Sequence, residues 1–391
     1  MENAERIKNL PRYLFAEIDK MIAEAKEEGV DVISFGIGDP DQPTPDNIVK
    51  RMIEAVQEPS THSYPSYEGL YDYRRAVADW YQKYYNIDLD PDSEVVSLIG
   101  SKEGIAHLPF CYINPGDKAL IPDPGYPVYK TSILLAGGEP VIVPLEAENN
   151  FLPDLDAIDE DIARRAKLFY INYPNNPTGA VAGQKFYKRV IEFAHKYDII
   201  IASDAAYSEI GLDGYEPISF MQLPGAKDVG IEFNSLSKPF NMTGWRIGWA
   251  VGNKDVIESL GRIKTNIDSG VFEAIQYAGI EALAYSMSNV GKMNKIYTRR
   301  RNIMIKGLRE LGWSVPENKA SFYIWAEVPA GYNSTEFSTY IFEKTGVFFT
   351  PGNGYGNFGE GYVRIALTVN EERIKEALTR LEDIQHIFSI S

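Results

Sequence analysis

The sequence predicts an α/β fold, with a large, mostly parallel seven-stranded sheet between helices and a smaller α+β domain. Seven short apolar runs rich in Val, Ile, Leu, Phe and Tyr lie between Glu94 and Val251, and four of them are almost entirely apolar. Continuous apolar runs are typical of strands that are buried on both faces. Helix-like segments such as Gln184–Tyr197 separate several of these runs. Strands that alternate with helices in this way indicate a parallel sheet with crossover helices.

The predicted elements fall into three parts of the chain. Residues 1–45 are expected to form an N-terminal arm that belongs with the small domain, with a helix at Pro11–Glu28 and an extended segment at Val32–Ile37. Residues 46–285 are expected to form the large domain, with strands at Val95–Ile99, Lys118–Pro122, Pro140–Pro144, Lys167–Asn172, Asp198–Ser203, Gly230–Asn234 and Arg246–Val251. Residues 286–391 are expected to form the C-terminal small domain, with a long helix, four strands and a last helix at Lys292–Leu311, Trp313–Val315, Ser321–Glu327, Val347–Thr350, Tyr362–Leu367 and Glu371–Ile384.

Composition and charge narrow the classes of function. The 391 residues include 39 basic and 55 acidic side chains, which gives a formal net charge of −16. Because a surface of that charge repels phosphate groups, neither a nucleic acid nor a membrane is an expected partner. One cysteine and four scattered histidines predict no internal disulfide and no metal site. The N-terminus is polar and no apolar run approaches about 18 residues, so we expect a cytoplasmic protein.

The polar residues that carry chemistry are expected just after the strands, where parallel sheets bind their ligands. Asp204 follows one apolar run, and Lys238 follows the next, between hydroxyls in Ser235–Leu–Ser–Lys–Pro239. Arg246 comes eight residues after Lys238. Each has a simpler interpretation, since an acid at a strand end can cap a helix and a lysine on a loop is usually solvated. The stretch Asn175–Gly179, after another strand, could be simply a turn.

An acid, a lysine between hydroxyls and an arginine at three successive strand ends together form the set that a pyridoxal phosphate site requires. The lysine forms a Schiff base with the cofactor aldehyde, and the acid keeps the pyridine nitrogen protonated. The protonated ring accepts the electrons that are released when the substrate loses its α-proton. Hydroxyls and an arginine bind the phosphate, the arginine through two parallel hydrogen bonds.

Three motifs resemble the signature set of the class I/II aminotransferases, namely Asn176–Pro–Thr–Gly179, Ser203–Asp–Ala–Ala–Tyr207, and Ser235–Leu–Ser–Lys238 followed by Thr243–Gly–Trp–Arg–Ile–Gly248. The resemblance covers nearly the whole chain, in order. It implies the fold of the fold type I pyridoxal phosphate-dependent transferases, with pyridoxal 5'-phosphate as cofactor. It also implies amino acid and 2-oxo acid substrates, and a homodimer with shared active sites.

The same resemblance implies roles for individual residues. Lys238 is expected to hold the cofactor and move the substrate proton, and Asp204 to pair with the pyridine nitrogen. Tyr207 and Asn176 are expected to bind the 3′-oxygen of the ring. The turn Gly100, Ser101, Lys102 at the start of a helix is expected to bind the phosphate together with Ser235, Ser237 and Arg246. Tyr126 is expected to stack on the ring, and Tyr64 to reach the phosphate in the neighbouring subunit.

For the substrate, the resemblance implies that Arg364 binds the α-carboxylate with Asn176 and the Gly38 backbone, whereas a surface salt bridge is the alternative for this arginine. Four further segments resemble the LL-diaminopimelate aminotransferases: Arg12–Ile18, Gly36–Pro40, Gly100–His107 and Thr265–Gly270. Such enzymes convert LL-diaminopimelate and 2-oxoglutarate to tetrahydrodipicolinate and glutamate in lysine biosynthesis. The further residues expected to contact the substrate, mostly at its distal end, are Tyr13, Tyr67, Glu68, Lys102, Tyr126 and Asn266.

Rival functions share many of these residues. An aspartate, alanine or aromatic aminotransferase uses the same cofactor site, and a pyridoxal phosphate-dependent lyase on the same fold needs no 2-oxoglutarate. A non-catalytic regulator is disfavoured because Lys238, Asp204 and Arg364 are all present. A dinucleotide site at Gly354–Gly359 is disfavoured as well, because a strand rather than a helix is expected after this G-x-G-x-x-G segment.

Overall fold

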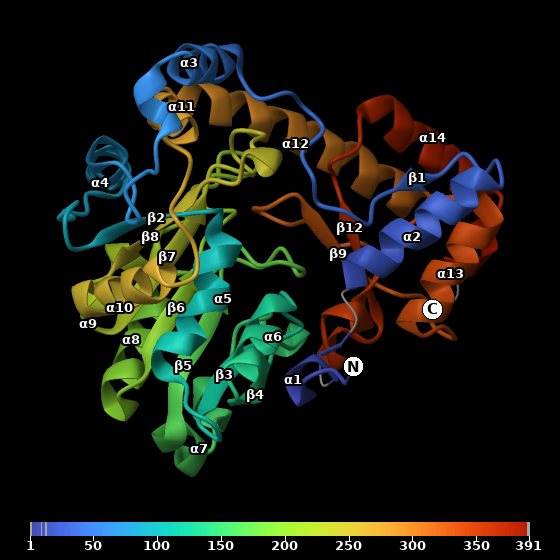
Figure 1. Ribbon diagram of the computed structural model, residues 1–391. Coiled ribbons are helices and arrows are strands. Elements are labelled where there is room, and N and C mark those ends of the chain that lie inside the picture. Colours follow the sequence, from blue (N-terminus) through green and yellow to red (C-terminus); the bar gives the residue numbers. More distant parts are fainter. Residues whose placement is uncertain (1, 9, 12–13, 389–391) are drawn as a thin grey trace.

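A seven-stranded sheet is the largest element of the computed structural model, which describes residues 2–8, 10–11 and 14–388 (Figure 1). The strands lie in the order β2–β8–β7–β6–β5–β3–β4. All neighbouring pairs from β7 to β4 are parallel, and β8 runs antiparallel to both β2 and β7. The mostly parallel sheet expected from the sequence is confirmed. Its strands are β2 (Val95–Leu98), β3 (Lys118–Asp123), β4 (Glu139–Pro144), β5 (Ala166–Asn172), β6 (Ile200–Asp204), β7 (Gly230–Ser235) and β8 (Gly248–Gly252).

Helices cover both faces of this sheet, which explains why its central strands carry apolar residues on both faces. In β5, Phe169 and Ile171 pack into the hydrophobic core on one face, whereas Leu168 and Tyr170 pack into the core on the other. Successive side chains of a strand point to opposite faces, so both sets must be apolar. The first core includes side chains of α3 (Asp46–Val56), α4 (Tyr71–Tyr85), α8 (Gln184–Tyr197) and α11 (Glu273–Ala284). The second includes side chains of α5 (Ser101–Tyr112), α6 (Val128–Leu135) and α10 (Lys254–Thr265).

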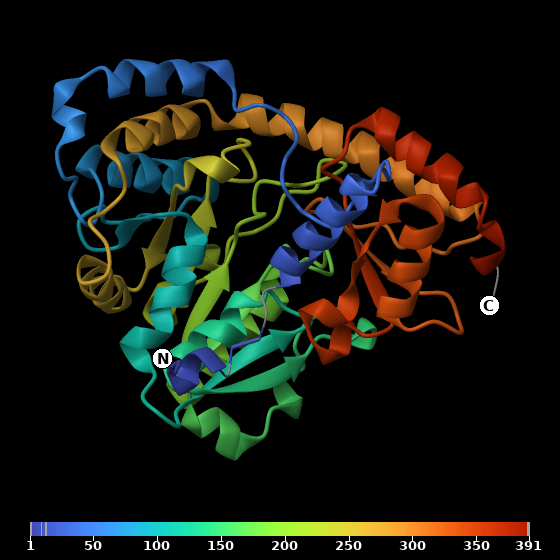
Figure 2. The ribbon, with the colours of Figure 1, turned by 45° about the vertical axis from the view of Figure 1, so that its right-hand side comes forward.

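The C-terminal part of the chain forms a second, antiparallel sheet in the order β11–β12–β9, with its own hydrophobic core. The long helix α12 (Ser286–Glu310) runs from the neighbourhood of α11 to α14 beside this sheet (Figures 1 and 2). The remaining elements here are β9 (Tyr323–Glu327), α13 (Ser334–Thr345), β10 (Val347–Phe348), β11 (Thr350–Pro351), β12 (Tyr362–Ala366) and α14 (Glu371–Glu382). In the large domain, the short helices α7 (Glu160–Arg165) and α9 (Ala226–Val229) lead directly into β5 and β7.

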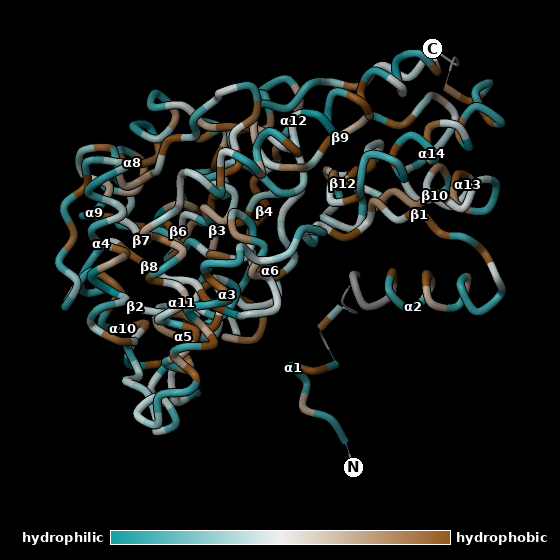
Figure 3. The backbone as a smooth tube through the Cα atoms, turned by 90° about the horizontal axis from the view of Figure 1, so that it is seen from above, coloured by the Kyte–Doolittle hydropathy of each residue, from teal (hydrophilic) through white to brown (hydrophobic). Residues whose placement is uncertain are grey.

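The N-terminal segment lies against this second sheet. The short strand β1 (Ile33–Ser34) pairs in parallel with β10, and α1 (Glu5–Lys8) and α2 (Leu14–Glu27) precede it. In Figure 3, α2 lies at the edge of the molecule next to β1 and β10, and hydrophobic and hydrophilic residues alternate along it. Its buried residues Ile18 and Ile22 pack against Phe348. No helix in the described part of the chain is both long and apolar enough to cross a membrane.

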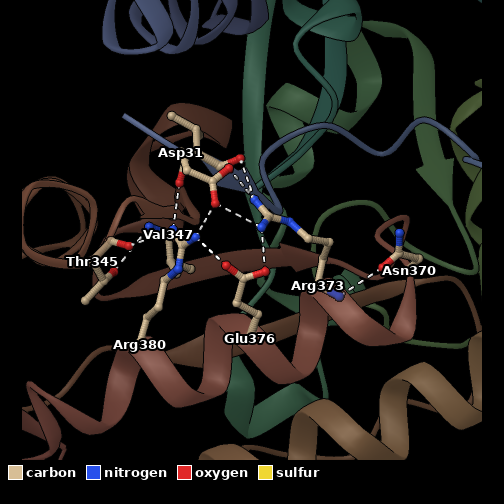
Figure 4. A network of polar contacts seen from close by, with 8 residues as sticks. Asp31, Thr345, Val347, Asn370, Arg373, Glu376 and Arg380 are labelled. Atoms are coloured by element: carbon tan, nitrogen blue, oxygen red, sulfur yellow. Dashed lines mark hydrogen bonds and ion pairs between the residues drawn. The ribbon is translucent and has the colours of Figure 1, made fainter. Parts of the chain in front are cut away.

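The segment that connects α2 and β1 is held to α14 by an ion-pair network (Figure 4). The carboxylate of Asp31 accepts hydrogen bonds from Arg373, at 2.7 Å, and from Arg380. Glu376 bridges the same two arginines on the surface of α14. The two guanidinium groups lower the pKa of Asp31 to about 2. The N-terminal segment is therefore held in two ways, by these ion pairs to α14 and by the pairing of β1 with β10.

Two expected strands of the C-terminal part differ from the structure. Residues 313–315 form no strand; Trp313 instead fills the core, where it stacks on Phe388 and donates its indole N–H to the carbonyl of Glu327 at 2.7 Å. The expected strand Val347–Thr350 is divided between β10 and β11, which belong to different sheets. Apolar residues in these segments thus serve packing, and only some of them join a ladder. The domain boundaries near residues 45 and 286 stay a prediction.

Candidate active site

A cavity of about 330 Å³ lies between the carboxyl ends of the large sheet's strands and the three-stranded sheet. It brings together twelve of the residues singled out from the sequence: Gly38, Ser101, Lys102, Tyr126, Asn176, Asp204, Tyr207, Ser235, Ser237, Lys238, Arg246 and Arg364. Parallel sheets bind ligands at this edge because their strands end there and leave loops free to carry polar groups.

Asp204 is the last residue of β6 and is buried. Its carboxylate accepts a hydrogen bond from the hydroxyl of Tyr129 at 2.7 Å and a longer one from the Ala206 amide at 3.3 Å. Burial raises the pKa of this carboxyl group to about 6. Residues 206–209 form a turn and no helix follows directly, so the alternative of a helix cap is wrong. Asp204 is instead a poorly compensated buried acid, which favours a cationic ligand group beside it.

Lys238 lies in the turn after β7, and its Nζ donates a hydrogen bond to the carbonyl of Gly38 at 2.6 Å. Burial lowers the pKa of the amine to about 8, although the nearby Asp39 acts in the opposite direction. The solvated-lysine alternative is therefore wrong. An amine with a lowered pKa has a larger neutral fraction near neutral pH, and only the neutral form is a nucleophile.

Hydrogen-bond donors gather at one end of the cavity. Ser235 donates its hydroxyl to that of Ser237 at 2.8 Å, beside the N-terminus of α5. Gly100, just before that helix, has φ +75°, and a Cβ there would lie 2.4 Å from a guanidinium nitrogen of Arg246. Arg246 also has a left-handed backbone, with φ +56°, which is uncommon outside glycine. A helix N-terminus, two hydroxyls and a guanidinium together suit a phosphate dianion.

Arg364 lies in the middle of β12 and is 1% exposed, so it makes no surface salt bridge. It donates hydrogen bonds to the side-chain oxygen of Asn176 at 2.8 Å and to the carbonyl of Gly36 at 2.6 Å. The segment that holds Asn176 is indeed a turn, in which the Asn175 side chain accepts from Thr178. The turn and the functional interpretation of this motif are thus compatible, because the turn brings Asn176 to the arginine.

Three residues of the site were missed by the sequence analysis. Tyr129 donates to Asp204, and Asn172 donates its amide to the Asp204 carbonyl at 2.7 Å while accepting from the Asn176 amide at 2.8 Å. Asn172 ends β5, so the rule of strand ends could have found it. Tyr323 lines the cavity and its hydroxyl lies 2.9 Å from that of Tyr207. No sequence signal distinguishes Tyr323 or Tyr129 among the 25 tyrosines of the chain.

Several predicted residues do not line the cavity. Tyr64 is 89% exposed, and Tyr67, Glu68 and Asn266 are exposed as well. Tyr13 lies outside the described residues. The exposed residues remain predictions, since their expected place is in the site of a neighbouring subunit or at the distal end of a bound substrate.

A partly buried group of charged and titratable side chains supports the turn before α5. Glu103, His107 and Asp268 have side-chain atoms within 4.8 Å of one another, the one such potential ligand group in the described ranges. The buried ammonium of Lys264 donates to Glu103 at 3.2 Å and to Asp268 at 2.9 Å. Glu103 also accepts from the Ile99 amide at 2.7 Å. Because the Lys264 ammonium pairs with both carboxylates, the group forms an ion-pair network that anchors the turn through Glu103.

Known proteins resemble this chain over nearly its whole length. The model of the family described as aminotransferase class I and II matches residues 30–381. An LL-diaminopimelate aminotransferase from Halothermothrix orenii is 79% identical, and one from Moorella thermoacetica is 60% identical, each match covering 98% of both chains.

Solved structures give the same result. The apo structure of BacF from Bacillus subtilis superimposes with a TM-score of 0.96 at 36% identity and covers 99% of both chains. A double mutant of aspartate aminotransferase from Thermus thermophilus has a TM-score of 0.91 at 26% identity, covering 98% of this chain and 100% of its own. The chain therefore belongs to the class I and II aminotransferases, which use pyridoxal 5'-phosphate as cofactor.

Proposed function

We propose that this chain transfers the amino group of LL-diaminopimelate to 2-oxoglutarate, giving tetrahydrodipicolinate, glutamate and water, and that the cavity described above is its active site. The strongest support is the 79% identity, over 98% of the chain, to a relative named LL-diaminopimelate aminotransferase. The cavity's lining supplies the groups that such a transfer needs.

The residues of the cavity fit pyridoxal 5'-phosphate. The carboxyl group of Asp204 is buried with neutral donors only, so a protonated ring nitrogen would supply the missing cation. Ser235, Ser237 and Arg246 would bind the phosphate together with the N-terminus of α5. Lys238, with its lowered pKa, is the amine that would hold the cofactor covalently. When bound, the cofactor supplies a ring that withdraws electrons from the substrate Cα.

The protein's own groups then divide the work. Arg364 would bind the substrate α-carboxylate through the two-pronged geometry of its guanidinium. Lys238, once its amine is free, would take the proton from Cα and return it to the neighbouring carbon of the cofactor. Asp204 would keep a proton on the ring nitrogen, and Tyr207 and Asn176 would bind the ring's 3′-oxygen. Lys102 and Tyr126, which also line the cavity, would lie beside the ring and the substrate.

We also propose that two copies of the chain share their active sites. The exposed Tyr64, Tyr67, Glu68 and Asn266 would complete the site of the partner subunit. Support comes from the exposed apolar residues near them in sequence, among which Ile267 is 54% exposed.

Mixing two inactive variants tests this sharing. Lys238→Ala and Tyr64→Ala subunits, unfolded together and refolded, should recover about a quarter of wild-type activity, because half of the dimers are mixed and each has one intact site. Each variant alone should remain nearly inactive. A mixture no more active than its components would contradict a shared site. So would a wild-type protein that is fully active while light scattering gives the molecular mass of a single chain.

The substrate is tested by comparing amino donors with 2-oxoglutarate as acceptor. We expect kcat/KM for LL-diaminopimelate to exceed that for aspartate, alanine and phenylalanine by at least about tenfold. A higher value for aspartate would favour the second candidate, which the similarity to the Thermus aspartate aminotransferase supports. Release of ammonia without 2-oxoglutarate would identify a lyase instead.

A further inference from the structure

Tyr323 contacts two functional groups of the cavity at once. It begins β9, is 2% exposed and lines the cavity. Its hydroxyl lies at hydrogen-bond distance, 2.9 Å, from the hydroxyl of Tyr207. The guanidinium carbon of Arg364 lies 4.2 Å from the centre of the Tyr323 ring. One side chain therefore touches both the tyrosine assigned to the cofactor and the arginine assigned to the substrate.

The strand pairing explains this double contact. In the antiparallel β9–β12 pair, Tyr323 is opposite Ala366 and Trp325 is opposite Arg364. Because side chains alternate along a strand, Tyr323 and Arg364 point to the same face as diagonal neighbours, within reach of long side chains. The backbone at Gly38 comes close to the same phenol, since a Cβ there would lie 2.0 Å from the Tyr323 hydroxyl. The phenol is thus enclosed on several sides, and its position is well defined.

We propose that Tyr323 is a positioning residue with two separable roles, which rest on the proposed function above. Its hydroxyl donates to the Tyr207 oxygen and so directs the Tyr207 proton toward the 3′-oxygen of the pyridoxal ring. Its ring face holds the Arg364 guanidinium in the orientation that binds the substrate carboxylate.

The direction of the first hydrogen bond follows from counting protons. Each tyrosine hydroxyl has one proton to donate and can accept as well. If Tyr207 donates its proton to the 3′-oxygen, its own oxygen can only accept from Tyr323. Hydrogen bonds in such a chain polarise one another, so the bond from Tyr323 makes Tyr207 a stronger donor.

The second role follows from the geometry around the guanidinium. Arg364 uses one nitrogen on Asn176 and another on Gly36, and these two contacts fix the direction in which it points. The faces of Tyr323 and Tyr355, at 4.2 and 4.9 Å from its central carbon, restrict how it can tilt. A cation over an aromatic face is attracted by the ring quadrupole, so the ring stabilises the charged group as well as confining it.

The hydroxyl role is tested with Tyr323→Phe, which keeps the ring and removes the hydroxyl. The control is Tyr297→Phe, because Tyr297 is buried in the same core and its hydroxyl has no hydrogen-bond partner among the described residues. The measurement is the pH titration of the visible absorbance of bound pyridoxal phosphate. We expect the midpoint of Tyr323→Phe to rise by about half a pH unit, since weaker donation destabilises negative charge on the 3′-oxygen. The control should titrate as the wild type does.

The ring role is tested with Tyr323→Leu, using glutarate as a dicarboxylate that binds without reacting. We expect the dissociation constant of glutarate to rise about fivefold in Tyr323→Leu and to stay near the wild-type value in Tyr323→Phe. The melting temperature of each apoprotein shows whether the variant is folded. If Tyr323→Leu does not fold, unchanged glutarate binding in Tyr323→Phe beside the shifted midpoint still supports separable roles.

The outcomes separate this inference from the proposed function. If the absorbance of Tyr323→Phe titrates with the same midpoint pH as the wild type and the control, the Tyr323 hydroxyl has no role beyond packing. Glutarate binding weakened equally by Tyr323→Phe and Tyr323→Leu would overturn the separation of the two roles. A wild-type protein without a visible absorption band would overturn the proposed site itself. Activity with a different amino donor would overturn only the proposed substrate.

Discussion

The two walls of the cavity are built in different ways. The strand-end wall consists of Asp204, which ends the buried strand β6, and Lys238, which follows the buried strand β7. The sheet wall consists of Arg364 and Tyr323, which lie within β12 and β9. On the strand-end wall, burial moves both pKa values toward neutrality, to about 6 for Asp204 and about 8 for Lys238. A pKa near neutrality suits Lys238 as the group that we propose to take and return the substrate proton.

The sheet wall is suited to binding. Two hydrogen bonds and two aromatic faces hold the guanidinium of Arg364 in place. The comparison teaches that the buried groups with shifted pKa values lie where strands end, whereas the guanidinium that we propose for substrate recognition is held rigidly inside a strand. Variants of the strand-end wall should therefore lower kcat, and variants of the sheet wall should raise KM.

The largest effect is expected for Lys238→Ala. The variant should still bind pyridoxal phosphate through the phosphate contacts but lose turnover by roughly 10⁴-fold, because its amine both holds the cofactor and moves the proton. Turnover with LL-diaminopimelate and a cofactor titration measure the two effects. Lys375→Ala, which alters an exposed lysine of α14, serves as the control. Appreciable transamination by the Lys238 variant would contradict the proposal that this lysine holds the cofactor and moves the proton.

Asp204→Ala should have the second largest effect and show the same bias toward kcat. Loss of the acid leaves the ring nitrogen without its partner, so Cα deprotonation should slow by about 10²-fold or more. Cofactor binding should weaken less, since one charged hydrogen bond is worth roughly 1.5–3 kcal/mol. Single-turnover deprotonation and cofactor titration separate the two. Deprotonation at the wild-type rate would mean that Asp204 has only a structural role.

Arg364→Lys probes the sheet wall and should act mainly on KM. Lysine keeps the charge but loses the planar, two-pronged donor, so KM for 2-oxoglutarate should rise by about 10- to 100-fold. The effect on kcat should be smaller, because in the proposed reaction Arg364 binds the carboxylate and takes no part in proton transfer. Steady-state kinetics with both substrates give the two constants. A fall in kcat as large as the rise in KM would erase the functional division between the walls.

The smallest effect concerns stability. In the apoprotein, the pKa of Asp204 is raised from 3.8 to about 6, so between these pH values the folded state binds more protons than the unfolded state. The contribution of Asp204 to stability therefore falls as the pH rises through this window. Relative to Asp204→Asn, the wild type should lose about 2 kcal/mol of unfolding free energy between pH 4 and pH 7. Urea unfolding of both apoproteins measures it, and a constant difference would contradict the raised pKa.

The large sheet could be predicted because its strands are marked by continuous apolar runs between turns. In the C-terminal part the same rule failed at Trp313–Val315, where apolar side chains fill a core without joining a ladder. Burial explains both outcomes, because the pattern reports which residues leave water and not which backbone groups pair. The exposed Tyr64 shows a further limit, since the fold of one chain carries no mark of the shared site that we propose for it.

The sequence by itself determined the strand-end wall. Asp204 ends one buried strand and Lys238 follows the next, and these two strands are parallel. Because parallel strands end at one edge, local patterns are enough to bring these residues together. The motif around Arg364 pointed to this arginine, but only the tertiary structure decided the contacts of the sheet wall. Arg364 meets Asn176 across 188 residues, and Tyr323 meets Tyr207 across 116. Those contacts depend on how two separate sheets pack against each other, and that packing is the sum of many side-chain contacts that no local pattern in the chain records.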